Sequence, residues 1–188
     1  MNVGPHIFVA LAIGASALSV DAMEVNSQPV CLVSAAGIGP IRLGMTLLEA
    51  KAAMPTTNFK RSSDGENAAH VTVHLGKEEL MTLNAQEDDS DKPIDWVKKI
   101  VFIETFNSRC KTAEGLFPGQ LVKEVEKKLG KTKEVMESEI ESRQFITFEK
   151  EPPHLIFRID YTGIFDDGSH RSTKFEPNSK ILSIAVYR

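Results

Sequence analysis

The feature that most constrains the fold of this 188-residue chain is a self-similarity at an offset of 75 residues. Residues 44–54 (GMTLLEAKAAM) align with residues 119–129 (GQLVKEVEKKL), with glycine over glycine and Glu49 over Glu124. The matched apolar positions step by three and four, which is the period of a helix with one apolar side. The pattern therefore predicts two short helices at equivalent places in two copies of one unit.

The ends of the two predicted helices carry recognisable signals. Thr46 and Glu49 have the spacing of a capping box at the start of the first helix. The second copy has Leu121 at the position of Thr46, so its first turn needs another cap. Pro55 and Gly130 lie just after the two helices, and both residue types end helices.

The same offset continues into short runs rich in β-branched and aromatic residues, which are typical of strands. Residues 71–74 align with 146–149, and residues 79–82 align with 154–157. A third strand is predicted in each copy at 97–103 and 181–187, where nine extra residues make the offset 84. The insertion falls within residues 161–180, whose Gly, Pro and Asn residues favour a loop.

Each copy is thus interpreted as a helix followed by three strands in meander order. Because one such unit cannot bury its apolar surfaces alone, we expect the copies to share a sheet. The sequence predicts an α+β fold with two tandem helix-plus-three-stranded-antiparallel-meander repeats, forming one curved sheet with helices on one face. Repeat one spans residues 37–104 and repeat two spans residues 105–188 of a single domain at 37–188.

The N-terminus has the pattern of an export signal. Residues 7–18 form an uncharged apolar run, too short to span a bilayer, and Val20-Asp21-Ala22 suits signal peptidase. We expect cleavage after Ala22, an N-terminal segment at 23–36, and a periplasmic or secreted protein. Residues 1–6 lack Lys and Arg, so a buried helix or strand at the domain edge is the alternative.

The sequence has two cysteines, Cys31 and Cys110. An even count in an oxidising compartment permits one disulfide, and two separately buried thiols are the alternative. Pro29 and Val30 precede Cys31 where a lipid-modified cysteine needs small residues, so no lipid anchor is expected. No other run reaches eighteen apolar residues, and no membrane span is predicted.

Two resemblances extend this interpretation. Residues 41–46 (IRLGMT) resemble the motif that opens the BamE (SmpA/OmlA) family and the tandem repeats of the β-lactamase-inhibitory protein. Residues 37–188 are similar to the sigma-E-regulated lipoprotein family of enterobacteria, a domain of unknown function. The similarity rests on 97–100 (VKKI), 112–115 (TAEG), Gly119, Gly130 and 180–184 (KILSI). It implies an envelope protein without an assigned reaction, although the lipid-attachment cysteine is missing.

Candidate chemistry is sparse. His70 and His74 would share a strand face at roughly 13 Å, which is too far apart for one metal ion. The acidic run at 87–91 lacks the glycine and distal glutamate of a calcium loop. No nucleophile elbow, local Cys–His pair or phosphate loop is present. We therefore predict no cofactor, no metal site and no enzymatic activity.

Charge and aromatic content bear on partners. The net charge is −4 without a basic stripe, and only 7% of residues are aromatic, so nucleic acid is not an expected partner. The candidate anchors for a protein partner are Trp96, Tyr161, Phe165 and Phe175. The alternative is that Trp96 and Phe165 pack into the core or under the loop.

The sequence thus favours an exported, non-catalytic envelope protein that binds another envelope protein or assists one. One alternative is an inhibitor of a secreted or periplasmic hydrolase, acting through a loop at 165–177. The second is a small hydrolase whose site is assembled in space from distant residues.

Overall fold

A computed structural model describes Met1 and residues 31–65, 68–87, 89–140 and 143–187. Apart from Met1, the predicted signal peptide at 1–22 lies outside these residues. In the described part of the chain, 46% of residues are in strands and 10% are in two short helices. The elements are β1 (Cys31–Ser34), β2 (Gly37–Ile38), β3 (Ile41–Arg42), α1 (Leu47–Ala53), β4 (Asn58–Ser63), β5 (Ala69–Leu75), β6 (Glu78–Glu87), β7 (Phe102–Thr105), β8 (Cys110–Thr112), α2 (Val122–Leu129), β9 (Thr132–Glu137), β10 (Gln144–Phe148), β11 (Leu155–Ile159), β12 (Gly163–Ile164), β13 (Arg171–Ser172), β14 (Lys174–Phe175) and β15 (Ile181–Tyr187).

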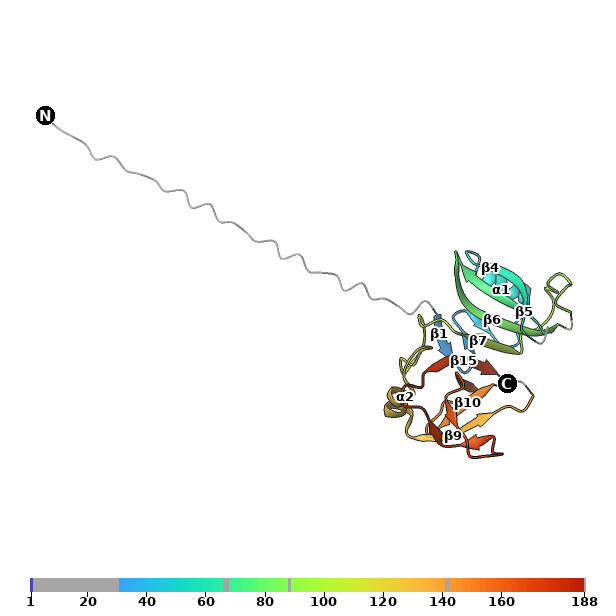
Figure 1. Cartoon of the computed structure of the whole chain (residues 1–188). Helices are drawn as coiled ribbons and strands as arrows, with labels where there is room; N and C mark the ends of the chain where they lie inside the picture. Colours follow the sequence, from blue (N-terminus) through green and yellow to red (C-terminus); the bar gives the residue numbers. More distant parts are fainter. Residues whose placement is uncertain (2–30, 66–67, 88, 141–142, 188) are drawn as a thin grey trace.

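The described strands form three sheets. The largest is antiparallel and has nine strands in the order β13-β9-β10-β11-β15-β7-β6-β5-β4. A four-stranded sheet has the order β3-β2-β1-β8, and β12 pairs with β14. Figure 1 shows β7 and β15 in the middle, α1 beside the β4–β6 end and α2 beside the β9–β10 end.

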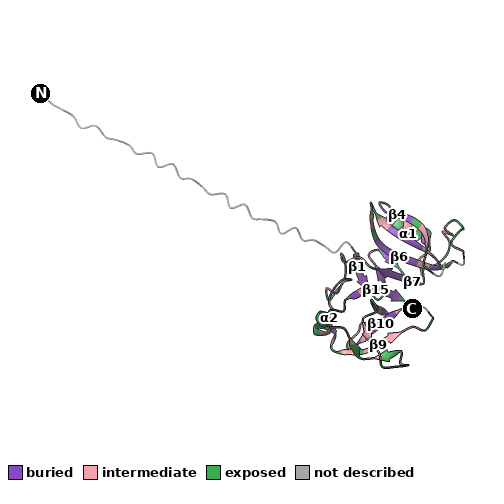
Figure 2. Cartoon of the chain, viewed as in Figure 1, coloured by how far each residue is buried: buried purple, intermediate pink, exposed green. Residues whose placement is uncertain are grey.

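The register of the nine-stranded sheet explains where the core lies. Residues opposite one another on neighbouring strands point to the same face, and successive residues alternate between faces. Val71, Leu83, Ile103 and Val186 lie in one such row, and all four are fully buried. Figure 2 shows buried residues, drawn in purple, along the central strands β6, β7 and β15. One face of the sheet therefore packs into the core, together with the buried sides of both helices.

The predicted helix ends are confirmed. The Thr46 side chain accepts from the backbone N–H of Glu49, whose carboxylate accepts from the backbone N–H of Thr46, so the capping box forms. These bonds hold the pKa of Glu49 below its usual range. At α2, Leu121 supplies no side-chain cap, and Gly130 ends the helix with a φ of 81°.

The predicted fold of two helix-plus-three-stranded-meander repeats is wrong. The protein is mostly β, and a nine-stranded sheet accompanied by two smaller sheets replaces that architecture. One cause is that β4 and β9 are polar strands, with few apolar residues to reveal them. Another is that the predicted strand at 97–103 is largely not one. Its first part pairs with the chain entering α1, where the Ile100 N–H donates to the Met45 carbonyl.

The four-stranded sheet includes β1, which lies within the N-terminal segment predicted at 23–36. Cys31 of β1 is paired in register with Cys110 of the parallel strand β8, and their Cα atoms are 4.6 Å apart. The two residues are joined in a buried disulfide. This bond fastens the first described strand to a segment 79 residues further along the chain.

Candidate binding site

The face of the nine-stranded sheet opposite the core carries polar side chains. We call it the polar face and define it by the row Thr72, Thr82 and Glu104, each residue opposite the next on β5, β6 and β7. Ser62 and His70 form a neighbouring pair on β4 and β5. Polar side chains in an otherwise well-packed sheet therefore gather on one surface.

The polar face lies on the inside of a strong bend. The Nη2 atom of Arg143, just before β10, is 3.4 Å from the Oδ2 atom of Asp64, just after β4. In a flat sheet, β4 and β10 would be six strand spacings apart, or roughly 29 Å. The ion pair can form only because the sheet curves until its two ends approach each other across the polar face.

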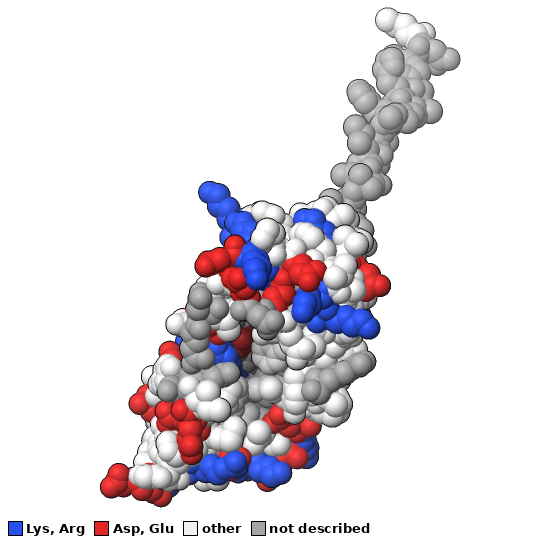
Figure 3. Space-filling model, turned by 90° about the vertical axis from the view of Figure 1, so that its right-hand side faces the viewer, with Lys and Arg blue, Asp and Glu red and all other residues white. Residues whose placement is uncertain are grey.

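This bend encloses a cavity of about 290 Å³, which we call the polar cavity. Its lining comes from β4 to β7 on one side and from Arg143 and Arg158 on the other. In Figure 3 the surface is hollowed between the two ends of the molecule, with basic and acidic side chains at its border. The cavity is thus built jointly by strands that are distant in the sequence.

A buried ion pair forms one wall of the polar cavity. Glu104 is 6% exposed and accepts from Arg158 Nη1 at 2.8 Å and from Ser183 Oγ at 2.5 Å. A buried carboxylate needs such partners because it has lost its contacts with water. Among the described residues, Arg158 Nε is buried without a hydrogen-bond acceptor, and Nη2 has no acceptor either. The guanidinium group therefore keeps donor capacity beyond its bond to Glu104.

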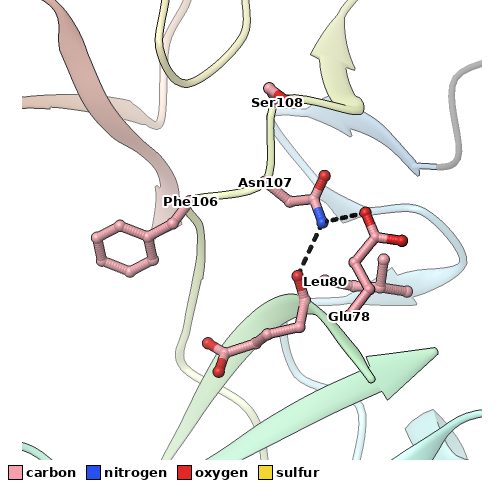
Figure 4. Close-up of a pocket in the computed structure, with 6 residues that line it drawn as sticks. Glu78, Leu80, Phe106, Asn107 and Ser108 are labelled. Carbon is pink, nitrogen blue, oxygen red and sulfur yellow. Dashed lines mark hydrogen bonds between the residues drawn. The ribbon is translucent and has the colours of Figure 1, made fainter. Parts of the chain in front are cut away.

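Phe106 stands at the edge of the polar cavity. It is 46% exposed, and its ring centre is 5.7 Å from the guanidinium carbon of Arg158. Figure 4 shows the ring pointing away from Asn107, whose side-chain amide donates to Glu78 Oε1 at 2.9 Å and to the Glu79 carbonyl at 2.8 Å. These bonds fix the segment that carries Phe106. The Asn107 bond and the Arg109 cation lower the pKa of Glu78.

One histidine on β5 lies near a hydroxyl and a carboxylate, the three kinds of group that form the catalytic triad of many hydrolases. His74 Nε2 is 2.9 Å from Thr72 Oγ1 and 4.0 Å from Glu79 Oε2. In a catalytic triad, one ring nitrogen faces the nucleophile and the other faces the carboxylate. Here the same nitrogen faces both groups, and Thr72 is only 8% exposed. This arrangement ties neighbouring side chains together and does not activate the hydroxyl.

The four aromatic residues proposed from the sequence as a partner surface are not together in the structure. Trp96 packs beside Phe59 of β4, with ring centres 6.2 Å apart, near one edge of the nine-stranded sheet. Phe165 and Phe175 belong to the segment near the other edge, and both are half-buried against the core. Tyr161 is 65% exposed. The segment at 165–177 contains β13 and β14, which pair with β9 and β12.

The remaining sequence candidates also have defined places. His70 and His74 lie on β5, and the acidic run at 87–91 extends from β6, with residue 88 outside the described part. No three His, Cys, Asp or Glu side chains among the described residues are grouped closely enough to hold a metal ion. None of the described helices has the length and apolar character of a membrane span.

Sequence reasoning missed the residues that form the ion pair of the polar cavity. Glu104 and Arg158 are single charges inside apolar strands, in the runs FIETF and LIFRI. A charge in such a run is a signal, because charged side chains are almost never fully buried unless they are paired. The pairing itself could not be found this way, since the two residues are 54 positions apart and lie on non-adjacent strands.

The molecule is a mostly-β protein whose curved sheet encloses a polar cavity. No model of a known protein family matches its sequence, and no curated protein matches it. Its fold is similar to the crystal structure of the uncharacterized protein yfeY from Escherichia coli, with a TM-score of 0.54 and 16% sequence identity. The alignment covers 83% of this chain and 99% of that chain. At this identity the likeness concerns the fold alone.

Proposed function

We propose that this protein is an exported, non-catalytic binding protein of the cell envelope, and that the polar cavity is its ligand site. The observation that carries the proposal is the contrast within the cavity lining. Its charged side chains Glu104 and Arg158 are paired with each other, as are Asp64 and Arg143. Within the described part of the chain, the neutral side chains of Ser62 and His70 have no hydrogen-bond partner, and such groups are suited to binding a polar ligand.

Export is supported by two independent features. The apolar run at 7–18 followed by Val20-Asp21-Ala22 has the pattern of a cleaved signal peptide. The Cys31–Cys110 disulfide is a bond that persists in oxidising compartments and is rare in the cytosol. The proposed location is the periplasm, after cleavage at Ala22.

A binding role is favoured over catalysis by the geometry of the polar face. The cluster closest to a catalytic arrangement is Thr72, His74 and Glu79, and it uses one histidine nitrogen for both contacts. Glu104 is paired with Arg158, and the hydroxyl that donates to Glu104 is that of Ser183. Ser183 donates a hydrogen bond to Glu104 but is fully buried, so its hydroxyl is not accessible to a substrate.

The export part of the proposal is tested by expressing the full chain in a bacterium and fractionating the cells. We expect the protein in the periplasmic fraction, with a mass that corresponds to a chain beginning at Met23. Thiol labelling after denaturation should find no free cysteine. Recovery of the uncleaved chain in the cytoplasm, with both thiols free, would contradict export.

The binding part is tested by retention of the purified protein on an immobilised envelope extract. We expect Thr82→Lys to abolish retention, because it places a long cation inside the polar cavity. The control is Val97→Lys, a position that is 73% exposed and lies outside the cavity lining. Equal retention of both variants and the unaltered protein would show that the polar cavity is not the ligand site.

A further inference from the structure

We infer that the ligand of the polar cavity is a neutral, polyhydroxylated carbohydrate chain. This inference rests on the proposed function and specifies the chemistry of the ligand. It follows from the charge balance of the cavity, its unpaired neutral hydrogen-bonding groups and its exposed aromatic ring.

The charges that line the polar cavity nearly cancel. Arg158 pairs with Glu104, and Arg143 pairs with Asp64, while Glu79 at the border is 45% exposed at its side chain. A phosphate or a strongly acidic chain would meet three carboxylates, and a polycation would meet two arginines. A neutral ligand avoids breaking either ion pair, so it incurs no cost from leaving a buried charge alone.

The neutral groups of the cavity have unused hydrogen-bonding capacity. No described residue gives a hydrogen-bond partner to Ser62 Oγ, to the side-chain nitrogen of Asn84 or to the His70 ring. Hydroxyl, amide and imidazole groups together both donate and accept hydrogen bonds. A sugar hydroxyl also does both, so a chain of hydroxyls can satisfy such a set without adding charge.

Arg158 adds a further donor for the same ligand. Its Nη1 atom donates a hydrogen bond to Glu104. Among the described residues Nη2 has no acceptor, and unlike Nε it is not buried. Because Arg158 lines the polar cavity, a hydroxyl oxygen there can accept from Nη2 without disturbing the ion pair. The guanidinium group would then hold the ligand on one side and Glu104 on the other.

Phe106 supplies the apolar part of the site. Sugars present a polar edge of hydroxyls and a less polar face of C–H groups. The face of an aromatic ring is electron-rich and attracts such C–H groups. Phe106 is 46% exposed beside these polar side chains, and Phe102 lines the same cavity. The combination of aromatic ring and neutral polar groups therefore matches both sides of a sugar.

The direct test is an NMR titration of the ¹⁵N-labelled protein with chitopentaose, maltopentaose and pentagalacturonic acid. We expect at least one neutral sugar to shift the amide signals of Ser62, Thr82 and Asn84 saturably, with a dissociation constant of about 1 mM or tighter. The acidic sugar should bind at least about tenfold more weakly. If neither neutral sugar gives saturable shifts at these amides, or the acidic sugar binds more tightly, the inference is wrong.

Variants tie the binding to the cavity. Phe106→Ala and Asn84→Ala are each expected to weaken binding of the neutral sugar about tenfold or more, and thermal melts check that both still fold. The matched control is Tyr161→Ala, which removes another exposed aromatic ring outside the cavity lining. Unchanged affinity in both cavity variants, or equal loss in Tyr161→Ala, would place sugar binding elsewhere and overturn the inference.

A second experiment separates this inference from the proposed function. The immobilised envelope extract is treated either with protease or with periodate, which cleaves vicinal diols of sugars. Retention that survives protease and is lost after periodate supports a carbohydrate ligand. Retention that is lost after protease and survives periodate overturns it in favour of a protein ligand, while the proposed binding function stands.

Discussion

The two faces of the nine-stranded sheet are formed by the same strands but differ in chemistry. On the core face, Val71, Leu83 and Ile103 are opposite one another and fully buried. One residue further along β5 and β7, and one residue back along β6, the polar face carries Thr72, Glu104 and Thr82. Apolar burial drives folding, whereas a buried ion pair contributes little compared with apolar side chains of similar volume. Folding therefore accounts for the first face, and the second is the face to which we assign the proposed binding function.

The largest expected effect contrasts two successive residues of β11. Phe157 is fully buried on the core face, where its ring meets that of Phe148 edge to face at 5.6 Å, and Ile156 is half-buried on the polar face. We expect Phe157→Ala to lower the free energy of unfolding by about 3–5 kcal/mol and Ile156→Ala by less than about 2 kcal/mol. Urea denaturation measures both. Equal losses would remove the distinction between the faces.

The next effect concerns the ion pair of the polar cavity. Glu104→Gln leaves the Arg158 charge with a neutral partner in a largely buried position, so we expect a loss of about 2 kcal/mol. The control is Glu78→Gln, which breaks the more exposed pair with Arg109 and should cost less than about 1 kcal/mol. The double variant Glu104→Gln/Arg158→Met should recover most of the loss. No recovery would show that the two side chains act independently.

A smaller, pH-dependent effect involves a partly buried carboxyl group that is not part of either face. Burial raises the pKa of Glu151 to about 7, although the Phe148 N–H donates to it at 3.0 Å. Because the folded protein holds this proton more tightly than the unfolded chain does, the stability that Glu151 contributes is lost as pH rises from about 4.5 to 7. Glu151→Gln, which cannot ionise, should be more stable than the unaltered protein at pH 8 and nearly equal at pH 4.5. Urea denaturation at both values tests this, and a difference that does not change with pH would contradict it.

The smallest effect on stability is expected at the edge of the polar cavity. Phe106→Ala should change the free energy of unfolding by less than about 1 kcal/mol, because nearly half of the side chain is already in contact with water. The same variant should weaken retention on the envelope extract. A large loss of stability would assign Phe106 to the fold, and intact retention would remove it from the site.

Sequence patterns predicted the elements whose own residues form caps, helix ends or apolar runs. The helix start at Thr46 and the helix end at Gly130 follow from local hydrogen bonding and backbone geometry. Strand β15 has the predicted bounds, and the cores of β5, β6, β10 and β11 fall on the predicted apolar runs. In contrast, β4 and β9 have few apolar residues. They become strands because the neighbouring strands β5 and β10 offer them a backbone to pair with.

What the sequence determined by itself is therefore local: where helices begin and end, and which runs are apolar enough to be buried as strands. The tertiary structure decided how many strands join one sheet, how far that sheet bends and which charges meet on its inner side. Glu104 and Arg158, or Asp64 and Arg143, lie far apart in the chain. Their approach depends on register and curvature, which are set by the packing of the whole sheet and are not encoded in any short segment.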